Sequence, residues 1–190
     1  MATKTKTTQT TKKVKGENAM RKIRLEKVVL SCGGSGEKLE KAVKLLTVLT
    51  KRKVAEIESS KRIPSFGVRP GLKTGVMVTL RGEEKEALLK RLFGAVGNKI
   101  KKKQIAKNHF SFGIKEYLEI PDMEYQRDIG VIGFDVTVVF RRAGKRTGVK
   151  KIKAGKVPIK QDVSVEEIAD YLKTKLNIDV EEAGKKSEED

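Results

Sequence analysis

The sequence contains few of the residues that build disulfide, metal or stacking sites. Its 190 residues include one cysteine (Cys32), one histidine (His109), no tryptophan and only 5% aromatic residues. One cysteine excludes an internal disulfide framework, and one cysteine with one histidine cannot form the usual zinc sites. Scarce aromatic residues argue against a wide platform on which bases could stack. We therefore expect no metal centre and no cofactor site.

Long apolar runs are also absent. No stretch approaches the roughly 20 apolar residues that cross a bilayer, and no apolar block follows the first charged residues. The sequence therefore predicts a soluble cytoplasmic protein with no membrane partner.

Positive charge is what the chain has in excess. Lysine and arginine number 43 against 25 aspartate and glutamate residues, which gives a formal net charge of +18. The last 30 residues carry ten acidic and four basic side chains, so that residues 1–160 have a net charge of +24. Such an excess favours polyanionic partners, with nucleic acid ahead of an anionic membrane surface.

The chain divides into a central domain and two polar ends. Residues 1–18 are mostly Thr, Lys and Gln and cannot offset the entropy of ordering, so we expect a disordered basic arm. Residues 181–190 also lack core-forming residues, which predicts a disordered acidic tail. The 37% apolar content is enough for one core, so residues 19–180 are expected to form a single RNA-binding domain.

Two periodicities alternate along this domain. Helical spacing of apolar residues predicts helices over 37–52, 83–100 and 164–176, the last of which begins with a capping box. Alternation of apolar and polar residues predicts strands over 21–30, 54–57, 76–81, 110–115 and 132–141. This mixture predicts an α+β fold of two layers, with a mainly antiparallel sheet whose helices lie on one face.

The other face of the predicted sheet is left free for RNA. Strand alternation places small hydroxyls and bases on it, and both kinds of group can donate hydrogen bonds to phosphate oxygens. The residues expected on this face are Thr79, Arg81, Ser111, Lys115, Thr137 and Arg141.

A second basic region covers residues 141–160, with nine bases and no acid. Three glycines and a proline interrupt it, and like charges at this density repel one another. We interpret it as a basic loop that becomes ordered on RNA. The residues expected to make accessory rRNA contacts are Arg141, Arg142, Lys145, Arg146, Lys150 and Lys151.

A third basic region is the segment 62–74, which contains Arg62, Arg69 and Lys73 and no acid. Two prolines and two glycines limit its backbone freedom and permit tight turns. The segment is therefore expected to be a loop that presents its bases to a second RNA.

No catalytic constellation is recognisable. The glycine-rich turn 33–38 lacks the spacing of a phosphate-binding loop, and Cys32 is interpreted as a packing residue. His109 has no readable nucleophile and carboxylate around it, so we expect a loop residue that stacks or hydrogen-bonds. Two alternatives remain open: a magnesium-dependent RNA-processing enzyme that uses carboxylates such as Asp135, and a free-standing RNA chaperone with no preference for one RNA.

Six sequence blocks, in order along the chain, resemble the large-subunit ribosomal protein five family, the universal 5S rRNA binders, in its archaeal-type form. Each block alone is weakly specific, but their shared order makes the match specific. The blocks are Met20–Leu30, Gly34–Ala42, Ile63–Arg69, Val78–Gly82, Phe110–Tyr117 and Ile129–Val136.

The resemblance implies a non-enzymatic component of the large ribosomal subunit. It implies that 5S rRNA is held through the sheet at the central protuberance, beside large-subunit rRNA and neighbouring large-subunit proteins. By motif, Thr79 and Arg81 would contact 5S rRNA, and Ser31 stands where the family commonly has Asn. The resemblance also implies a loop that reaches the tRNA in the peptidyl (P) site, and the residues expected there are Arg62, Ser65, Phe66, Arg69 and Lys73.

Overall fold

The computed structural model describes residues 18–181. Its strands are β1 Ile23–Gly33, β2 Ala55–Glu58, β3 Lys73–Leu80, β4 Lys99–Lys101, β5 Ile105–Ala106, β6 His109–Ile114, β7 Phe134–Arg142 and β8 Asp179–Glu181. Its α-helices are α1 Glu37–Thr50, α2 Glu84–Ala95, α3 Arg146–Val149 and α4 Val165–Tyr171. Short helical turns are η1 Ala19–Arg21, η2 Pro64–Phe66, η3 Lys102–Gln104, η4 Tyr117–Glu119 and η5 Ile159–Gln161, and a π-helical segment, η6 Leu172–Leu176, continues α4.

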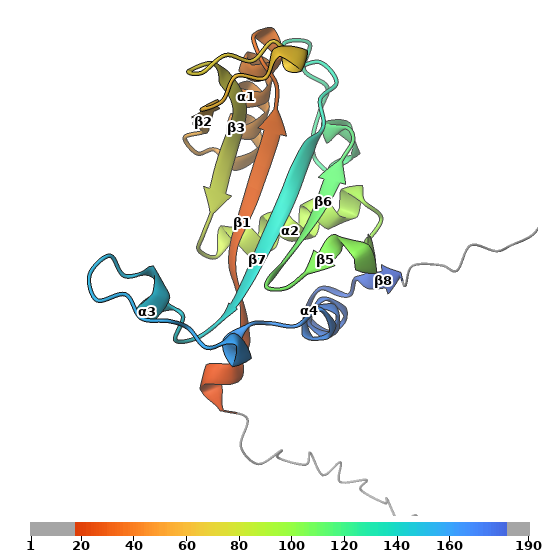
Figure 1. Cartoon of the computed structure of the whole chain (residues 1–190). Coiled ribbons are helices and arrows are strands. Elements are labelled where there is room, and N and C mark those ends of the chain that lie inside the picture. Colours follow the sequence, from red (N-terminus) through yellow and green to blue (C-terminus); the bar gives the residue numbers. More distant parts are fainter. Residues whose placement is uncertain (1–17, 182–190) are drawn as a thin grey trace, which may run out of the picture.

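A six-stranded antiparallel sheet forms one layer of the fold. Its strand order is β2-β3-β1-β7-β6-β5, so β1, the first strand of the chain, lies between β3 and β7. A separate pair, β4 and β8, is parallel and joins the segment after α2 to the C-terminal end of the described chain. Figure 1 shows the sheet as a twisted ribbon layer with α1 and α2 behind it.

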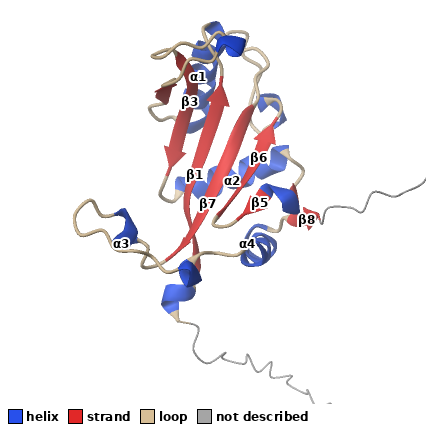
Figure 2. Ribbon diagram, in the orientation of Figure 1, coloured by secondary structure: helices blue, strands red, loops and turns tan. Residues whose placement is uncertain are grey.

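Burial alternates along the central strands. In β3, Val76, Val78 and Leu80 are buried while the residues between them are not, and β1, β6 and β7 follow the same pattern. Since successive side chains point to opposite faces of a strand, one face of the sheet is core and the other is open. Helices α1 and α2 cover only the core face (Figure 2). The predicted two-layer α+β fold is therefore confirmed.

An aromatic cluster fills the core between the sheet and the helices. The ring of Phe93 on α2 stacks on Phe112 with 5.0 Å between centroids, and Phe110 lies between Phe112 and Phe140 at 6.0 and 5.8 Å. Tyr171 of α4 meets Phe140 edge-on. Offset and edge-on pairs of this kind stabilise a core beyond their buried area, so the cluster ties α2 and α4 to the same strands.

Helix α2 is shorter than the sequence predicts. The apolar periodicity indicates a helix over 83–100, but the helix ends at Ala95, where Gly97 and Asn98 adopt positive φ angles of 66° and 57°. The amide of Asn98 donates back to the carbonyl of Phe93, which closes the last turn. Ile100, read as the last residue of a helical stripe, is buried in β4 instead. The expected helix beyond Ala95 is therefore wrong.

The C-terminal helix begins where the sequence predicts. Ser164 accepts a hydrogen bond from the amide of Glu167, whose carboxylate accepts one from the amide of Ser164, so the predicted capping box is confirmed. The expectation of a disordered acidic tail is wrong at its first residue, because Glu181 belongs to β8. The remaining residues of that tail, and residues 1–17 of the expected basic arm, lie outside the described chain.

Candidate nucleic-acid interface

The open face of the sheet, here called the outer face, has a row of small uncharged side chains across its middle. Val29 of β1 stands opposite Thr79 of β3 on one side and Thr137 of β7 on the other. Thr137 stands opposite Ser111 of β6, and their hydroxyl oxygens lie 3.2 Å apart. Short side chains let a polynucleotide approach the backbone closely, and hydroxyls both donate and accept hydrogen bonds. The predicted residues Thr79 and Ser111 therefore do share one surface.

The next row of the outer face is centred on Ser31. This residue stands opposite Met77 of β3 and Asp135 of β7, and Asp135 stands opposite Gly113 of β6. Ser31 is half-buried and Asp135 is exposed. From the sequence, Asp135 is named only as a carboxylate of the alternative magnesium-dependent enzyme, and the strand register places it within this row.

Arg81 and Lys115 lie just beyond the strands to which the sequence assigns them. Strand β3 ends at Leu80 and β6 at Ile114, and both bases are exposed in the turns that follow. Since β3 and β6 run in opposite directions in Figure 1, the two bases flank opposite ends of the outer face. The prediction that both bases lie within the strands is wrong by one residue. Both nevertheless lie at the edge of the outer face.

The loop between β2 and β3 is an ordered projection. Ile63 and Val68 exchange two backbone hydrogen bonds, of 2.9 and 3.1 Å. The amide of Ser59 donates to the carbonyl of Leu72, and the carbonyl of Ser59 accepts from the amide of Gly71, both at 2.9 Å. Gly67 supplies the left-handed conformation (φ 64°) that closes the turn after η2. This scaffold leaves Arg62, Ser65, Phe66 and Arg69 exposed, with 79% of Phe66 accessible.

Lys73 does not belong to this loop. It is the first residue of β3, and its ammonium lies 2.5 Å from a carboxylate oxygen of Glu56 on β2. The hydrogen bond and charge of Glu56, together with the charge of Glu58, raise the pKa of Lys73. The expected position of Lys73 in an acid-free loop is therefore wrong, because the sheet brings two acids from β2 beside it.

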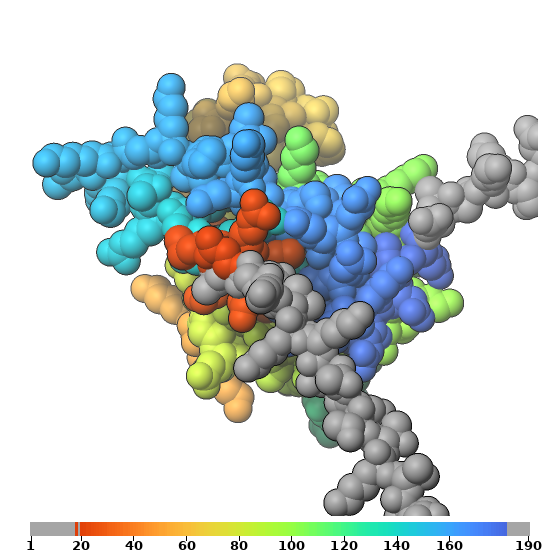
Figure 3. All heavy atoms as spheres, turned by 90° about the horizontal axis from the view of Figure 1, so that it is seen from below, coloured from red at the N-terminus to blue at the C-terminus, as the bar shows by residue number. Residues whose placement is uncertain are grey.

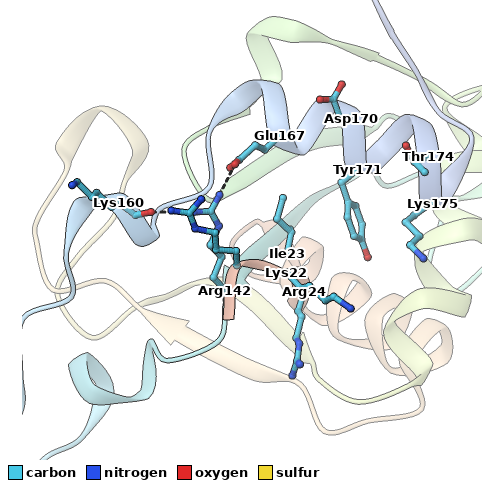
Figure 4. A pocket seen from close by; sticks show the side chains of 11 residues that line it. Lys22, Ile23, Arg24, Arg142, Lys160, Glu167, Asp170, Tyr171, Thr174 and Lys175 are labelled. Carbon is cyan, nitrogen blue, oxygen red and sulfur yellow. Dashed lines mark hydrogen bonds and ion pairs between the residues drawn. The ribbon is translucent and has the colours of Figure 1, made fainter. Parts of the chain in front are cut away.

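A basic cleft opens at the end of the sheet opposite the β2–β3 loop. It has a volume of about 1060 Å³ and lies between the start of β1, the end of β7 and the C-terminal helix. Figure 4 shows Arg142 on its floor, where the guanidinium donates to a carboxylate oxygen of Glu167 at 2.5 Å and to the carbonyl of Lys160 at 3.0 Å. Burial raises the pKa of Tyr171, which also lines the cleft.

Five exposed bases line the cleft around that floor: Arg21, Lys22, Arg24, Lys160 and Lys175. None of them forms an ion pair within residues 18–181. Sequence reasoning missed this cluster, although the bases at 21–24 were visible, because Lys175 is far away in the sequence. Arg142, which is also predicted as an rRNA contact, fastens β7 to α4.

The basic segment 141–160 is partly structured. Arg141 pairs with Glu26 on β1 at 3.1 Å, and α3 interrupts the expected irregular loop. Seen from below in Figure 3, this segment, cyan to blue, projects from the body beside the red residues that precede β1. Arg146, Lys150 and Lys151 are exposed on it, and Lys145 is half-buried.

The residues considered for catalysis stand apart from one another. His109 is the first residue of β6 and not a loop residue, and its Nδ1 atom lies 3.0 Å from the carbonyl oxygen of Lys107. Cys32 is buried, as a packing residue should be. Within the described residues, no three His, Cys, Asp or Glu side chains gather as metal ligands would. Nor does that part of the chain contain a helix long and apolar enough to span a membrane.

Comparison with known proteins supplies the family. A family model described as "Ribosomal protein L5" matches residues 18–69, and the model of the C-terminus of the same ribosomal family matches residues 73–165. A Nanoarchaeum equitans protein named Large ribosomal subunit protein uL5 is 41% identical over 167 residues, which cover 86% of this chain and 99% of the relative. The chain belongs to the ribosomal protein L5 family.

Two further L5 relatives carry the same name. The Picrophilus torridus protein is 38% identical over 168 residues, which cover 86% of this chain and 96% of the relative. The Sulfurisphaera tokodaii protein is 39% identical over 169 residues, which cover 87% of this chain and 96% of the relative. Membership of the L5 family confirms the archaeal-type resemblance and the expectation of a structural ribosomal protein that is not an enzyme.

Proposed function

We propose that the outer face of the sheet binds 5S rRNA and helps to attach it to the large ribosomal subunit. As a member of the L5 family, the chain is a structural, non-catalytic protein of the large subunit in the cytoplasmic ribosome. It associates there with large-subunit rRNA and with neighbouring ribosomal proteins. The choice of 5S rRNA as the RNA on the outer face is the proposed step.

One observation carries this proposal: no element within residues 18–181 covers the hydroxyl row of the outer face, in a chain of net charge +18. An open sheet face of α+β proteins usually meets solvent or a partner. Here Thr79, Thr137 and Ser111 offer hydroxyls to sugar and phosphate oxygens, while Arg81 and Lys115 offer charge at the edges. The arrangement suits a folded RNA that is recognised by shape and backbone.

The test compares variants that remove single groups from the outer face. Arg81→Ala should weaken 5S rRNA binding by about tenfold to a hundredfold, because a charge-assisted hydrogen bond contributes roughly 1.5–3 kcal/mol. Thr79→Val keeps the side-chain shape, removes the hydroxyl and should cost less. Affinity is measured by filter binding, with circular dichroism to check the fold.

Lys90→Ala on α2 is the matched control, since it removes one exposed base from the helix layer. It should bind 5S rRNA as the parent does. Parental affinity in both outer-face variants would refute the assignment of this face, and equal affinity of the parent for 5S rRNA and an unrelated RNA would support a general RNA chaperone.

A second function is favoured by the ordered loop between β2 and β3. It presents Arg62, Ser65, Phe66 and Arg69 away from the sheet on a hydrogen-bonded scaffold. A pre-ordered loop loses little entropy when it binds. We propose that it contacts the tRNA in the P site through phosphate and sugar groups, which all tRNAs share.

Replacing Arg62 and Arg69 together by Ala should leave 5S rRNA binding intact and increase the rate at which tRNA dissociates from the P site of assembled ribosomes. The matched control replaces Lys38 and Lys44 on α1, two exposed bases of the helix layer. Equal dissociation rates for all three ribosomes would exclude the loop, and a loss of 5S rRNA binding would assign it to the outer-face site.

A further inference from the structure

The outer face contains a hollow of about 470 Å³ at the end where β1 and β6 finish and β7 begins. In Figure 1 this is the upper end of the sheet. The residues of the hollow that face outward are Ser31, Gly33, Gly113, Lys115, Gly133 and Asp135. We call this set the glycine hollow.

Two glycines keep side chains out of this part of the sheet. A Cβ atom added to Gly113 would lie 3.1 Å from a carboxylate oxygen of Asp135, and one added to Gly133 would lie 2.4 Å from the carbonyl oxygen of Lys115. At these two positions the hollow is therefore lined by bare backbone. A planar group can enter between the side chains that border it.

Asp135 is the acid at this border. The carboxylate is exposed, and within the described chain it makes no hydrogen bond or ion pair. A carboxylate on a surface that meets phosphates is repelled by them and loses water when the RNA docks. Such a group weakens binding unless the RNA brings hydrogen-bond donors to it.

Among the four bases, guanine has the edge that fits. Its N1–H and N2–H groups lie side by side on the Watson–Crick edge and can donate in parallel to the two oxygens of one carboxylate. Adenine and cytosine place a ring acceptor beside their amino group, and uracil flanks its N–H with two carbonyls, so a carboxylate repels part of each edge. The edge of guanine is free for protein only where the base is unpaired.

We propose that the glycine hollow binds one unpaired guanine of 5S rRNA, with Asp135 accepting hydrogen bonds from its N1–H and N2–H groups. Lys115 binds the adjoining phosphate, and Ser31 borders the base on the β1 side. The proposal rests on the 5S rRNA function proposed above and adds base specificity to it.

Asp135→Asn tests this with the full-length chain and 5S rRNA. The amide keeps the size of the side chain, but it replaces one acceptor by a donor that opposes N1–H or N2–H. We expect affinity to fall about tenfold or more, the size of one bidentate base contact. The salt dependence should not change, because no phosphate contact is lost. Kethoxal attacks N1 and N2 of unpaired guanines. One guanine of 5S rRNA that the parent protein protects from kethoxal should become reactive again in the complex with the variant.

Gly113→Ala is a second variant, because its methyl group would enter the hollow beside Asp135 while the backbone there is ordinary extended strand. It should expose the same guanine. Glu40→Gln on α1, an exposed acid of the helix layer, is the matched control and should change neither affinity nor protection.

The outcomes separate this proposal from its premise. If Asp135→Asn binds 5S rRNA as tightly as the parent or more tightly, the carboxylate only repels phosphate and the guanine site is wrong, although the outer-face function stands. Weaker binding with every guanine still protected would also overturn it. If the parent itself does not distinguish 5S rRNA from an unrelated RNA, the proposed function and the guanine site both fail.

Discussion

Cys32 and Ser31 are neighbours on β1 with opposite environments. Ser31 lies on the outer face, whereas the Cys32 side chain is 7% exposed, and its thiol donates to the carbonyl oxygen of Gly133 at 3.3 Å. Burial, and then the charge of Asp135, raises the pKa of the Cys32 thiol. The folded protein therefore keeps this thiol protonated at a pH where an unfolded chain would begin to ionise it.

This raised pKa predicts slow alkylation. Iodoacetamide attacks the thiolate, so modification of Cys32 should begin at a higher pH in the folded protein than in the same protein in urea. Asp135→Asn removes a charge that opposes ionisation and should shift the folded profile to slightly lower pH. Rates are followed by mass spectrometry, and superimposable profiles for folded and unfolded protein would contradict the prediction.

At the scale of elements, one side chain connects the C-terminal helix to the sheet. Glu167 closes the capping box of α4 through one carboxylate oxygen and pairs with Arg142 of β7 through the other. The Arg142 side chain is only 12% exposed, so loss of its partner would leave a largely buried guanidinium without its countercharge.

Glu167→Ala should therefore lower the free energy of unfolding by about 2 kcal/mol, from the cap and the ion pair together. The neighbouring Glu166→Ala removes an exposed acid of the same first turn and should cost much less. Urea denaturation of both variants provides the measurement. If both variants lose the same free energy of unfolding, Glu167 contributes only its charge near the helix N-terminus.

Local patterns predicted most elements but not those that depend on distant partners. Alternation in residues 76–80 and 110–114 correctly placed Thr79 and Ser111 on one face, because burial of one strand face leaves a period of two. Strands β4 and β8 are three residues each and lie about 80 residues apart, too short for a pattern and too distant for a turn signal. The pairing of Lys73 with Glu56 and the basic cleft likewise depend on tertiary contacts.

At the scale of the whole molecule, charge should control how tightly RNA is held. Binding releases counterions from phosphates, so the logarithm of the affinity for 5S rRNA should fall linearly with the logarithm of salt concentration. Residues 1–17 hold five lysines and one glutamate. Deleting them should make the slope shallower and leave the preference for 5S over an unrelated RNA nearly unchanged, since phosphate contacts carry no sequence information.

Nitrocellulose binding over a range of potassium chloride concentrations measures both quantities. A flat response of the parent would contradict an electrostatic contribution. A loss of preference after the deletion would show that residues 1–17 recognise the RNA and do not only attract it.

The central position of β1 has a consequence for synthesis of the protein. Once Leu80 has emerged from the ribosome, β1 can pair with β3, but its other edge stays open until β7, which ends at Arg142, has emerged as well. Pairing across so many residues forms late, because a long loop must close first. Unfinished chains therefore present only half of the outer face. An RNA that docks across β3, β1, β7 and β6 would discriminate complete protein from truncated protein, so that assembly of the particle would also select for full-length chains.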